Sequence, residues 1–517
     1  MTRKFPPPAP PELVLIADPK AKLRVKNGRI TSIDPEFDFS PLANLLASAE
    51  AVIAPLYGVS EDWVQLRTVR TEKMMGEGQR LDLSIFYKIS APAGLASLAP
   101  ALREIDFIKA AYVKPGVELT IIDNSIESVD GLPPGPVTGN FTPQQVYLND
   151  VSDGGIGVPC AWAKRGGRGA GVNIVDVEGA WRFSHEDLLQ NSCGLITGGG
   201  VPTNDLGWRN HGTAILGIIG GDDNKFGVTG ICPDASVRST SVFGSSSGDP
   251  VPNWSAAAAI RLAADSLRPG DIILIEHHLP GPVVNYEPND DQLGYIPIEW
   301  WPCNLAAIQY ATSHGIIVVE AAANGKQNLD DPIYSVPPPE FPDWWLNPFS
   351  KGSIDSGAIL VGAGYPPKKV HGGNDELDRT RVKESNFGSR VDVQGWGDNV
   401  VTCGYGGLAD NDEDEDRWYT SRFNGTSSAA AMVAGAVGCL QGIMRARQTL
   451  LDPISLRTLL RDNSLNSPQR ALIGNPDDVH IGPRPDLCKL IDHLIPSLTF
   501  VEKTMVLIKT RKLAWRL

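Results

Sequence analysis

Three residues of this 517-residue chain have the side chains of an acid, a base and a nucleophile: Asp176, His211 and Ser427. A serine hydroxyl is a poor nucleophile at neutral pH unless a base lies within hydrogen-bond reach, and the base needs an orienting group. Asp176 ends the apolar run VNIVD, where a carboxylate is costly to bury without a partner. A histidine that donates its Nδ1 proton to Asp176 would be such a partner. Together, these three residues predict that Ser427 attacks a substrate while His211 acts as its base.

The sequences around His211 and Ser427 both predict the start of a helix. His211 begins NHGTAILGIIGG, and Ser427 lies in FNGTSSAAAMVAG. The unpaired N–H groups of a helix start favour developing negative charge, and small side chains let a substrate backbone approach. Each residue alone also has an ordinary structural explanation, since a serine at this position is often a helix cap and a lone histidine is usually structural.

The order Asp, His, Ser, with HGT around the histidine and NGTSSAAAMVAG around the serine, resembles the subtilisin-like serine proteases over roughly residues 150–495. The resemblance implies a serine endopeptidase that cleaves polypeptides through an acyl-enzyme and needs no cofactor for the chemistry. Asn324, in VVEAAANG, is similar to the residue that supplies the oxyanion-hole amide in this family.

The chain departs from the family pattern at several positions. Val177 and Glu178 follow Asp176, where the family has Ser or Thr and then Gly, while Ala214 and Ala431 replace a common histidine and proline. These departures leave two alternatives open. One is an esterase or amidase with the same triad, and the other is a catalytically impaired binding or regulatory protein.

The resemblance also assigns the substrate cleft. It implies that an extended peptide pairs with the backbone of four residues, His278, Leu279, Pro280 and Gly281. Pro280 has no N–H, which would reduce the pairing there. The aromatic-rich insertion from Val283 to Trp301 either reshapes the specificity pocket or forms a packed surface loop.

A structural Ca²⁺ site is a further expectation from the resemblance, in the loop DDNKFGV. Its oxygen ligands would come from Asp187, Asp222, Asn224, Phe226 and Val228. The alternative is a simple hydrogen-bonded turn rich in Asp and Asn.

The elements that must position these residues are predicted from short apolar runs that alternate with helical patterns. The runs span residues 171–177, 235–243, 271–279, 315–324 and 357–365. Strands that are apolar on both faces are typical of a parallel sheet covered by helices. We therefore expect an α/β fold of the subtilisin-like, three-layer α/β/α type with a mainly parallel central sheet.

The sequence divides into three expected parts: a small α+β domain over residues 1–140, a catalytic domain over 141–495 and a tail over 496–517. The strand, helix, strand pattern before the Pro- and Gly-rich linker 132–143 is similar to the propeptide of the family. It implies a zymogen whose own N-terminal domain inhibits the enzyme until it is cut before about Asn149. The alternative is a permanently attached domain.

Composition limits partners and compartment. The net charge of −14 argues against a nucleic-acid partner, and without an apolar run of about 20 residues we expect no transmembrane segment. Prolines interrupt the first residues where a signal peptide would be apolar, so we expect a cytoplasmic or non-classically exported monomer. Seven cysteines, an odd number without a CxxC, exclude a complete disulfide framework and argue against zinc. The acidic run 410–416 is interpreted as a solvated loop, with cation binding as the alternative.

Overall fold

The structure is a computed structural model of the chain. It describes residues 5–32, 36–67, 82–92, 94–120, 122, 138–189, 194–244, 255–367, 370, 377–408, 414–471, 474 and 476–495. Residues 132–137 of the expected linker, residues 410–413 of the acidic run and the expected tail 496–517 lie outside this part.

A six-stranded parallel sheet forms the centre of the larger domain, with the strand order β15-β14-β13-β10-β8-β9. Its strands are β8 (Asn173–Glu178), β9 (Ser236–Ser241), β10 (Ile272–Ile275), β13 (Ile317–Ala321), β14 (Ile359–Gly364) and β15 (Val393–Trp396). Each of the five predicted apolar runs contains one of these strands, while β15 lies outside the runs.

Helices cover both faces of this sheet, because alternate residues of each strand point to opposite sides. Ile272 and Leu274 of β10 pack in one core with helices α5 and α8, whereas Ile273 and Ile275 pack in a second core with α6 and α7. The helices of this domain are α4 (Val158–Trp162), α5 (Leu206–Gly220), α6 (Ala256–Ser266), α7 (Pro302–Ser313), α8 (Gly425–Ala446), α9 (Pro453–Arg461) and α10 (Leu487–Leu494). The predicted three-layer α/β/α class is confirmed.

Helix α8 is long and apolar enough to cross a membrane by composition alone, but 94% of its most apolar stretch is buried inside the protein. Its apolar residues are accounted for by the core that they share with α5 and the sheet. The helix therefore gives no evidence of a membrane span.

The N-terminal part forms a separate four-stranded antiparallel sheet with the order β4-β5-β1-β6. Its elements are β1 (Glu12–Ala17), β2 (Val25–Lys26), β3 (Arg29–Ile30), α1 (Ser40–Ser48), β4 (Val52–Pro55), β5 (Phe86–Ser90), α3 (Leu95–Arg103) and β6 (Ile108–Lys114). The predicted order of strand, helix and strand corresponds to β5, α3 and β6.

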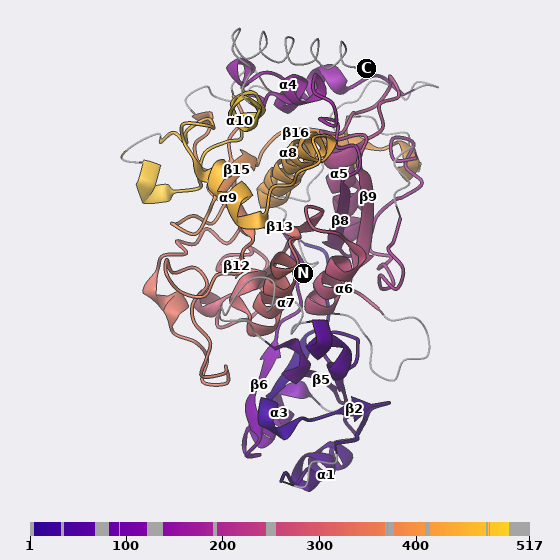
Figure 1. Cartoon of the computed structure of the whole chain (residues 1–517), viewed down its shortest axis with the longest axis vertical. Coiled ribbons are helices and arrows are strands. Elements are labelled where there is room, and N and C mark those ends of the chain that lie inside the picture. Colours follow the sequence, from indigo (N-terminus) through magenta and orange to yellow (C-terminus); the bar gives the residue numbers. More distant parts are fainter. Residues whose placement is uncertain are drawn as a thin grey trace, which may run out of the picture.

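One face of this N-terminal sheet packs on α6 and α7 of the larger domain, which places the small domain at one end of the long axis (Figure 1). Polar contacts reinforce the apolar interface. The Tyr57 hydroxyl donates to the carbonyl of Cys303 at 2.8 Å, and Arg67 pairs with Asp265 at 2.7 Å.

Besides the two-stranded β2–β3 sheet of the N-terminal part, two small sheets complete the fold. One has the order β12-β11-β7, with β7 (Glu118–Leu119), β11 (His277–Pro280) and β12 (Tyr295–Pro297); the other pairs β16 (Val400–Cys403) with β17 (Tyr419–Phe423). Short 3-10 helices lie at Pro19–Ala21, Leu83–Ile85, Thr142–Gln144, Val146–Leu148, Val151–Asp153, Pro282–Val284, Ile298–Trp300, Pro332–Ser335, Glu415–Arg417 and Pro476–Val479. Strand β7 follows the small domain in sequence but joins a sheet of the larger one.

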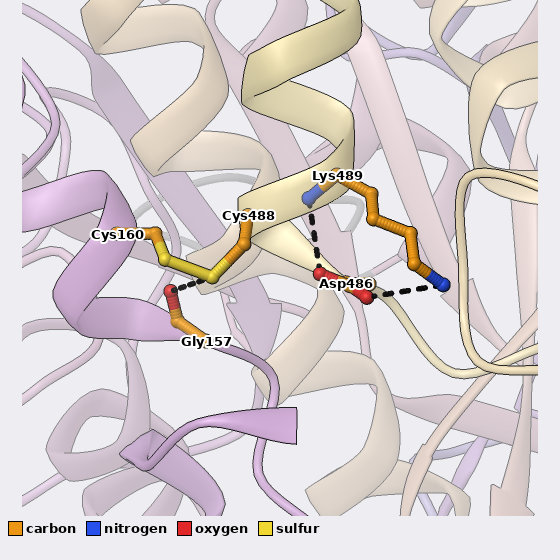
Figure 2. Close-up of a disulfide and its surroundings, with 5 residues drawn as sticks. All are labelled: Gly157, Cys160, Asp486, Cys488 and Lys489. Atoms are coloured by element: carbon orange, nitrogen blue, oxygen red, sulfur yellow. Dashed lines mark hydrogen bonds and ion pairs between the residues drawn. A yellow bond between two sulfur atoms is a disulfide. The ribbon is translucent and has the colours of Figure 1, made fainter. Parts of the chain in front are cut away.

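A disulfide between Cys160 of α4 and Cys488 of α10 links two segments that are 328 residues apart (Figure 2). Asp486 caps α10 by accepting the backbone N–H of Lys489 at 3.0 Å. Among the described residues the other cysteines, Cys232, Cys303, Cys403 and Cys439, are buried and form no disulfide. One bridge beside these four cysteines agrees with the expectation that no complete disulfide framework exists.

Candidate active site

The imidazole of His211 pairs with the carboxylate of Glu178. Glu178 is the last residue of β8, and its Oε1 forms a short hydrogen bond with Nδ1 of His211, while both side chains are fully buried. Burial lowers the pKa of His211 to about 3 and raises the pKa of Glu178 well above its ordinary value. The neutral imidazole is therefore oriented by Glu178.

Asp176 does not contact His211 in this structure, which corrects the predicted triad. Its Oδ2 accepts the indole N–H of Trp181 at 2.7 Å. Asp176 and Glu178 lie two residues apart on one strand and so face the same side of the sheet. The longer Glu178 side chain makes the contact with the histidine.

Helix α5 begins at Leu206, five residues before the predicted start at His211. Asp205 caps it by accepting the backbone N–H of Trp208 at 3.0 Å. His211 consequently lies in the second turn, and it is buried rather than exposed as a first-turn residue would be. The signal for the true start was Asp205, since aspartate is a preferred N-cap residue.

Ser427 lies in the first turn of α8 and is covered by Thr120, which follows β7. The Ser427 hydroxyl makes a short contact with the Thr120 hydroxyl and donates to the Thr120 carbonyl at 3.1 Å. No described residue forms a hydrogen bond with Nε2 of His211. The Ser427 hydroxyl is thus engaged by a segment of the chain itself and forms no hydrogen bond with His211.

Asn324 lies beside the same carbonyl. Its Oδ1 accepts from the backbone N–H and the hydroxyl of Thr426, both at 3.0 Å, which fixes the amide plane. Its Nδ2 has no hydrogen-bond partner in the described part of the chain. A Cβ placed on Gly425 would lie 2.4 Å from the Thr120 carbonyl oxygen and 3.0 Å from Nδ2 of Asn324, so both atoms face this glycine.

Glu276, which the sequence did not suggest, adds a third buried carboxyl group to the site. It lies between β10 and β11, and its backbone carbonyl accepts from the Thr120 hydroxyl at 3.1 Å. Burial and the charges of Asp176 and Glu178 raise its pKa well above the ordinary value, and the Ser427 side chain opposes this rise. Its carboxyl oxygens form no hydrogen bond with any described residue. The effect of the Ser427 side chain on the pKa of Glu276 indicates that the two side chains lie near each other.

The strand beside the cleft is β11, and its register differs from the prediction. Leu119 lies opposite His277, and Glu118 lies opposite His278. Of the four residues that were expected to bind substrate, only His278 pairs with β7. Leu279 and Pro280 pair with β12 instead, and the N–H of Gly281 donates to Gly294. The cleft strand starts one residue earlier than expected, at His277.

The insertion between Val283 and Trp301 packs partly in the core and partly against the segment that ends at Thr120. Trp300 and Trp301 are buried in the core with α7. Tyr295 instead contacts β7, because its hydroxyl donates to Glu118 at 2.7 Å. The insertion therefore contributes to the wall of the cleft.

The five residues of the expected calcium site are close together, but they are arranged as a hydrogen-bonded turn. One carboxylate oxygen of Asp187 accepts the side-chain N–H of Asn224, and the other accepts the backbone N–H of Val228, each at 2.7 Å. Asn224 Oδ1 accepts from the backbone of Phe226, and Asp222 accepts the N–H of Leu189. These side-chain oxygens already accept N–H groups, as in the alternative of a hydrogen-bonded turn, while Ca²⁺ binding at this loop stays a prediction.

Buried charge also distinguishes this turn. Burial raises the pKa of Asp187 to about 7, although its hydrogen bonds to Val228 and Asn224 oppose the rise.

The acidic residues Glu415 and Asp416, at the described end of the acidic run, pair with Arg209 and Arg182. These two carboxylates are engaged in ion pairs within the protein.

Comparisons with known proteins agree with this geometry. The model of the peptidase S8 subtilase family matches residues 194–476, which is more than half of the chain. The chain is 24% identical over 311 residues to an extracellular protease of Xanthomonas campestris pv. campestris, covering 59% of this chain and 42% of that protein. It is 29% identical over 121 residues to the major intracellular serine protease of Bacillus subtilis, covering 22% and 36%. The chain spans less than half the length of both relatives.

Among solved structures, fervidolysin from Fervidobacterium pennivorans, a keratinolytic enzyme related to subtilisin, matches with a TM-score of 0.50 at 14% identity. The match covers 95% of this chain and 62% of that one. At this level of identity the likeness concerns the fold alone. Because the family model covers more than half of the chain, the chain belongs to the subtilase family.

Proposed function

We propose that this chain is a serine endopeptidase in zymogen form. In the proposed mechanism Ser427 is the nucleophile, His211 the general base, Glu178 the residue that orients His211, and Asn324 a donor to the oxyanion. The observation that carries the proposal is the position of Thr120. The carbonyl of this extended segment accepts the Ser427 hydroxyl at 3.1 Å, and both this carbonyl and the amide nitrogen of Asn324 lie beside Gly425.

The reaction follows from these positions. As Ser427 Oγ attacks the substrate carbonyl carbon, Nε2 of His211 accepts the hydroxyl proton, and Glu178 stabilises the imidazolium that forms. Asn324 Nδ2 and the Ser427 backbone N–H donate to the oxygen as it becomes negative. The C–N bond then breaks, His211 protonates the leaving amine, and water repeats the sequence to release the acyl group.

We further propose that the N-terminal domain is an intramolecular inhibitor. Its exit segment, Glu118 and Leu119, adds a strand to β11 as an extended peptide substrate would. The bond after Thr120 would then be the first one cut, upstream of the linker that the sequence suggested. The large interface between the small sheet and α6 and α7 would retain the domain after this cut until it is degraded.

Labelling with a fluorophosphonate, followed by mass analysis, tests the assignment directly. We expect covalent modification at Ser427 and cleavage of peptides as well as esters. Cleavage of esters alone would favour the esterase or amidase alternative. Absence of both labelling and turnover, after release of the N-terminal domain, would favour a catalytically impaired binding protein.

A further inference from the structure

The side chain of Glu118 occupies a buried position in the cleft although it is a carboxyl group. Only 1% of its surface is exposed, and its Oε1 accepts the hydroxyl of Tyr295 at 2.7 Å. Burying a carboxyl group is costly unless polar partners compensate for the lost water. The larger domain supplies this partner, so the contact site remains when the N-terminal domain leaves.

The surroundings of Tyr295 keep its hydroxyl in place. Its ring packs against the ring of His278, with 4.6 Å between the centroids, and His278 lies opposite Glu118 in the strand register. The backbone N–H of Asn289 donates to the Tyr295 oxygen at 3.3 Å, which leaves the hydroxyl proton for Glu118. The pocket is therefore held together before a substrate arrives.

A second contact fixes the position of Glu118 along the cleft. The side-chain amide of Gln292 donates to the carbonyl of Leu119 at 2.9 Å. Thr120 then presents its carbonyl to Ser427, so Glu118 lies two residues before the residue whose carbonyl would be attacked. Both Gln292 and Tyr295 belong to the insertion between Val283 and Trp301.

We propose that this pocket makes the enzyme selective for peptides with a glutamate two residues before the cleaved residue, and that Tyr295 is the specificity-determining residue. The proposal rests on the proposed function of the same site. When the glutamate of a substrate is ionised, its hydrogen bond from the Tyr295 hydroxyl is stronger than the bond that a neutral, isosteric glutamine would accept, so Tyr295 favours glutamate. A lysine would place a second donor opposite the hydroxyl and is disfavoured.

The test compares quenched fluorescent peptides that carry Val-Glu-Leu-Thr, Val-Gln-Leu-Thr or Val-Lys-Leu-Thr before the cleaved bond, with the full chain after it has processed itself. We expect kcat/KM for the glutamate peptide to exceed that of the glutamine peptide about fivefold or more, with the lysine peptide weakest. Tyr295→Phe should reduce the preference for glutamate over glutamine to nearly one. Tyr286→Phe, in the same insertion but stacked on Trp300, is the matched control and should retain it.

Full-length protein gives a second readout that does not depend on peptide cleavage. Glu118→Gln should weaken the binding of residues 118–120 in the cleft and so speed fluorophosphonate labelling of Ser427. Glu104→Gln, outside the cleft, should not change the labelling rate. Equal turnover of the three peptides, or equal loss for all of them in Tyr295→Phe, would overturn the selectivity while leaving the peptidase intact. Cleavage of none of them, together with no labelling, would overturn the proposed function and the selectivity with it.

Discussion

Glu178 and His211 form a fully buried carboxylate–imidazole pair, while Asp176, two residues earlier on the same strand, is bound by Trp181. The pair joins the end of β8 to the second turn of α5, so the two elements hold the imidazole between them. A base must be oriented before it can accept a proton from a serine. The division of roles between two acids on one strand therefore has direct consequences for catalysis.

Glu178→Gln should lower kcat/KM for peptides by about 10³–10⁴-fold, because an amide cannot stabilise the imidazolium and can hold the wrong tautomer. Asp176→Asn should cost less than about tenfold, since an amide oxygen can still accept the indole N–H of Trp181. Steady-state kinetics, with the active sites counted by fluorophosphonate, would measure both. A larger loss in Asp176→Asn than in Glu178→Gln would contradict the assignment of Glu178.

Much of the fold and part of the site could be predicted from the sequence because their signals are local. The apolar runs predicted five strands of the central sheet. The motifs around His211, Asn324 and Ser427 predicted the candidate catalytic residues, whose assembly into one catalytic group stays a prediction. The choice between Asp176 and Glu178 could not be made this way, because both face the same side of β8. The available signal is the carboxyl group of Glu178, two residues after Asp176, where the family pattern has a glycine.

Contacts between segments that are far apart in the chain could not be predicted from the local sequence. Thr120 covers Ser427 although 307 residues separate them, and nothing in the local sequence around Thr120 indicates this contact. The strand register of β11 against β7 likewise depends on where the small domain docks. The sequence therefore predicts a cleft strand that starts one residue too late, and it does not indicate Glu276 or Tyr295.

Self-cleavage should divide the parent chain after Thr120, because that carbonyl is the one presented to Ser427. Mass analysis of the purified parent should give an N-terminal fragment of residues 1–120. Ser427→Ala should remain intact. Ser428→Ala, whose hydroxyl instead donates to the Trp396 carbonyl at 2.8 Å, is the neighbouring control and should still be cut. The same fragment from Ser427→Ala would exclude self-cleavage.

Chelation should leave the stability of the loop around Asp187 unchanged, because its carboxylate is already satisfied by the N–H groups of Asn224 and Val228. We expect the Tm of the Ser427→Ala chain to be the same in EDTA and in excess Ca²⁺, as measured by calorimetry. A Tm that falls in EDTA and recovers with Ca²⁺ would mean that these residues rearrange to bind the ion.

The disulfide between Cys160 and Cys488 should stabilise the folded chain, since it closes a long loop and restricts the unfolded state. Cys160→Ser should lower the free energy of unfolding by about 2–5 kcal/mol. A reducing agent should lower the Tm of the parent and have no such effect on Cys160→Ser. Equal responses of the two proteins to the reductant would show that the bridge does not form.

Glu276→Gln should change how stability depends on pH. Burial and the charges of Asp176 and Glu178 raise the folded-state pKa of Glu276, so the folded protein retains a proton that the unfolded chain has released above its ordinary value of 4.5. Its stabilising contribution is therefore complete in acid and is lost as the pH rises through the folded-state pKa. Removing this carboxyl should make the variant more stable than its parent at neutral pH and similar to it near pH 4.

Thermal unfolding of Ser427→Ala chains with and without Glu276→Gln, at several pH values between about 4 and 8, measures this difference without interference from self-cleavage. His211 responds in the opposite sense, because its folded-state pKa is lowered to about 3: its contribution is present above the unfolded-state pKa near 6.5 and is lost as the pH falls from there through the folded-state pKa. Both chains contain His211, so its effect cancels in the comparison. A difference in Tm that stays constant with pH would mean that Glu276 is not buried beside the other two carboxyl groups.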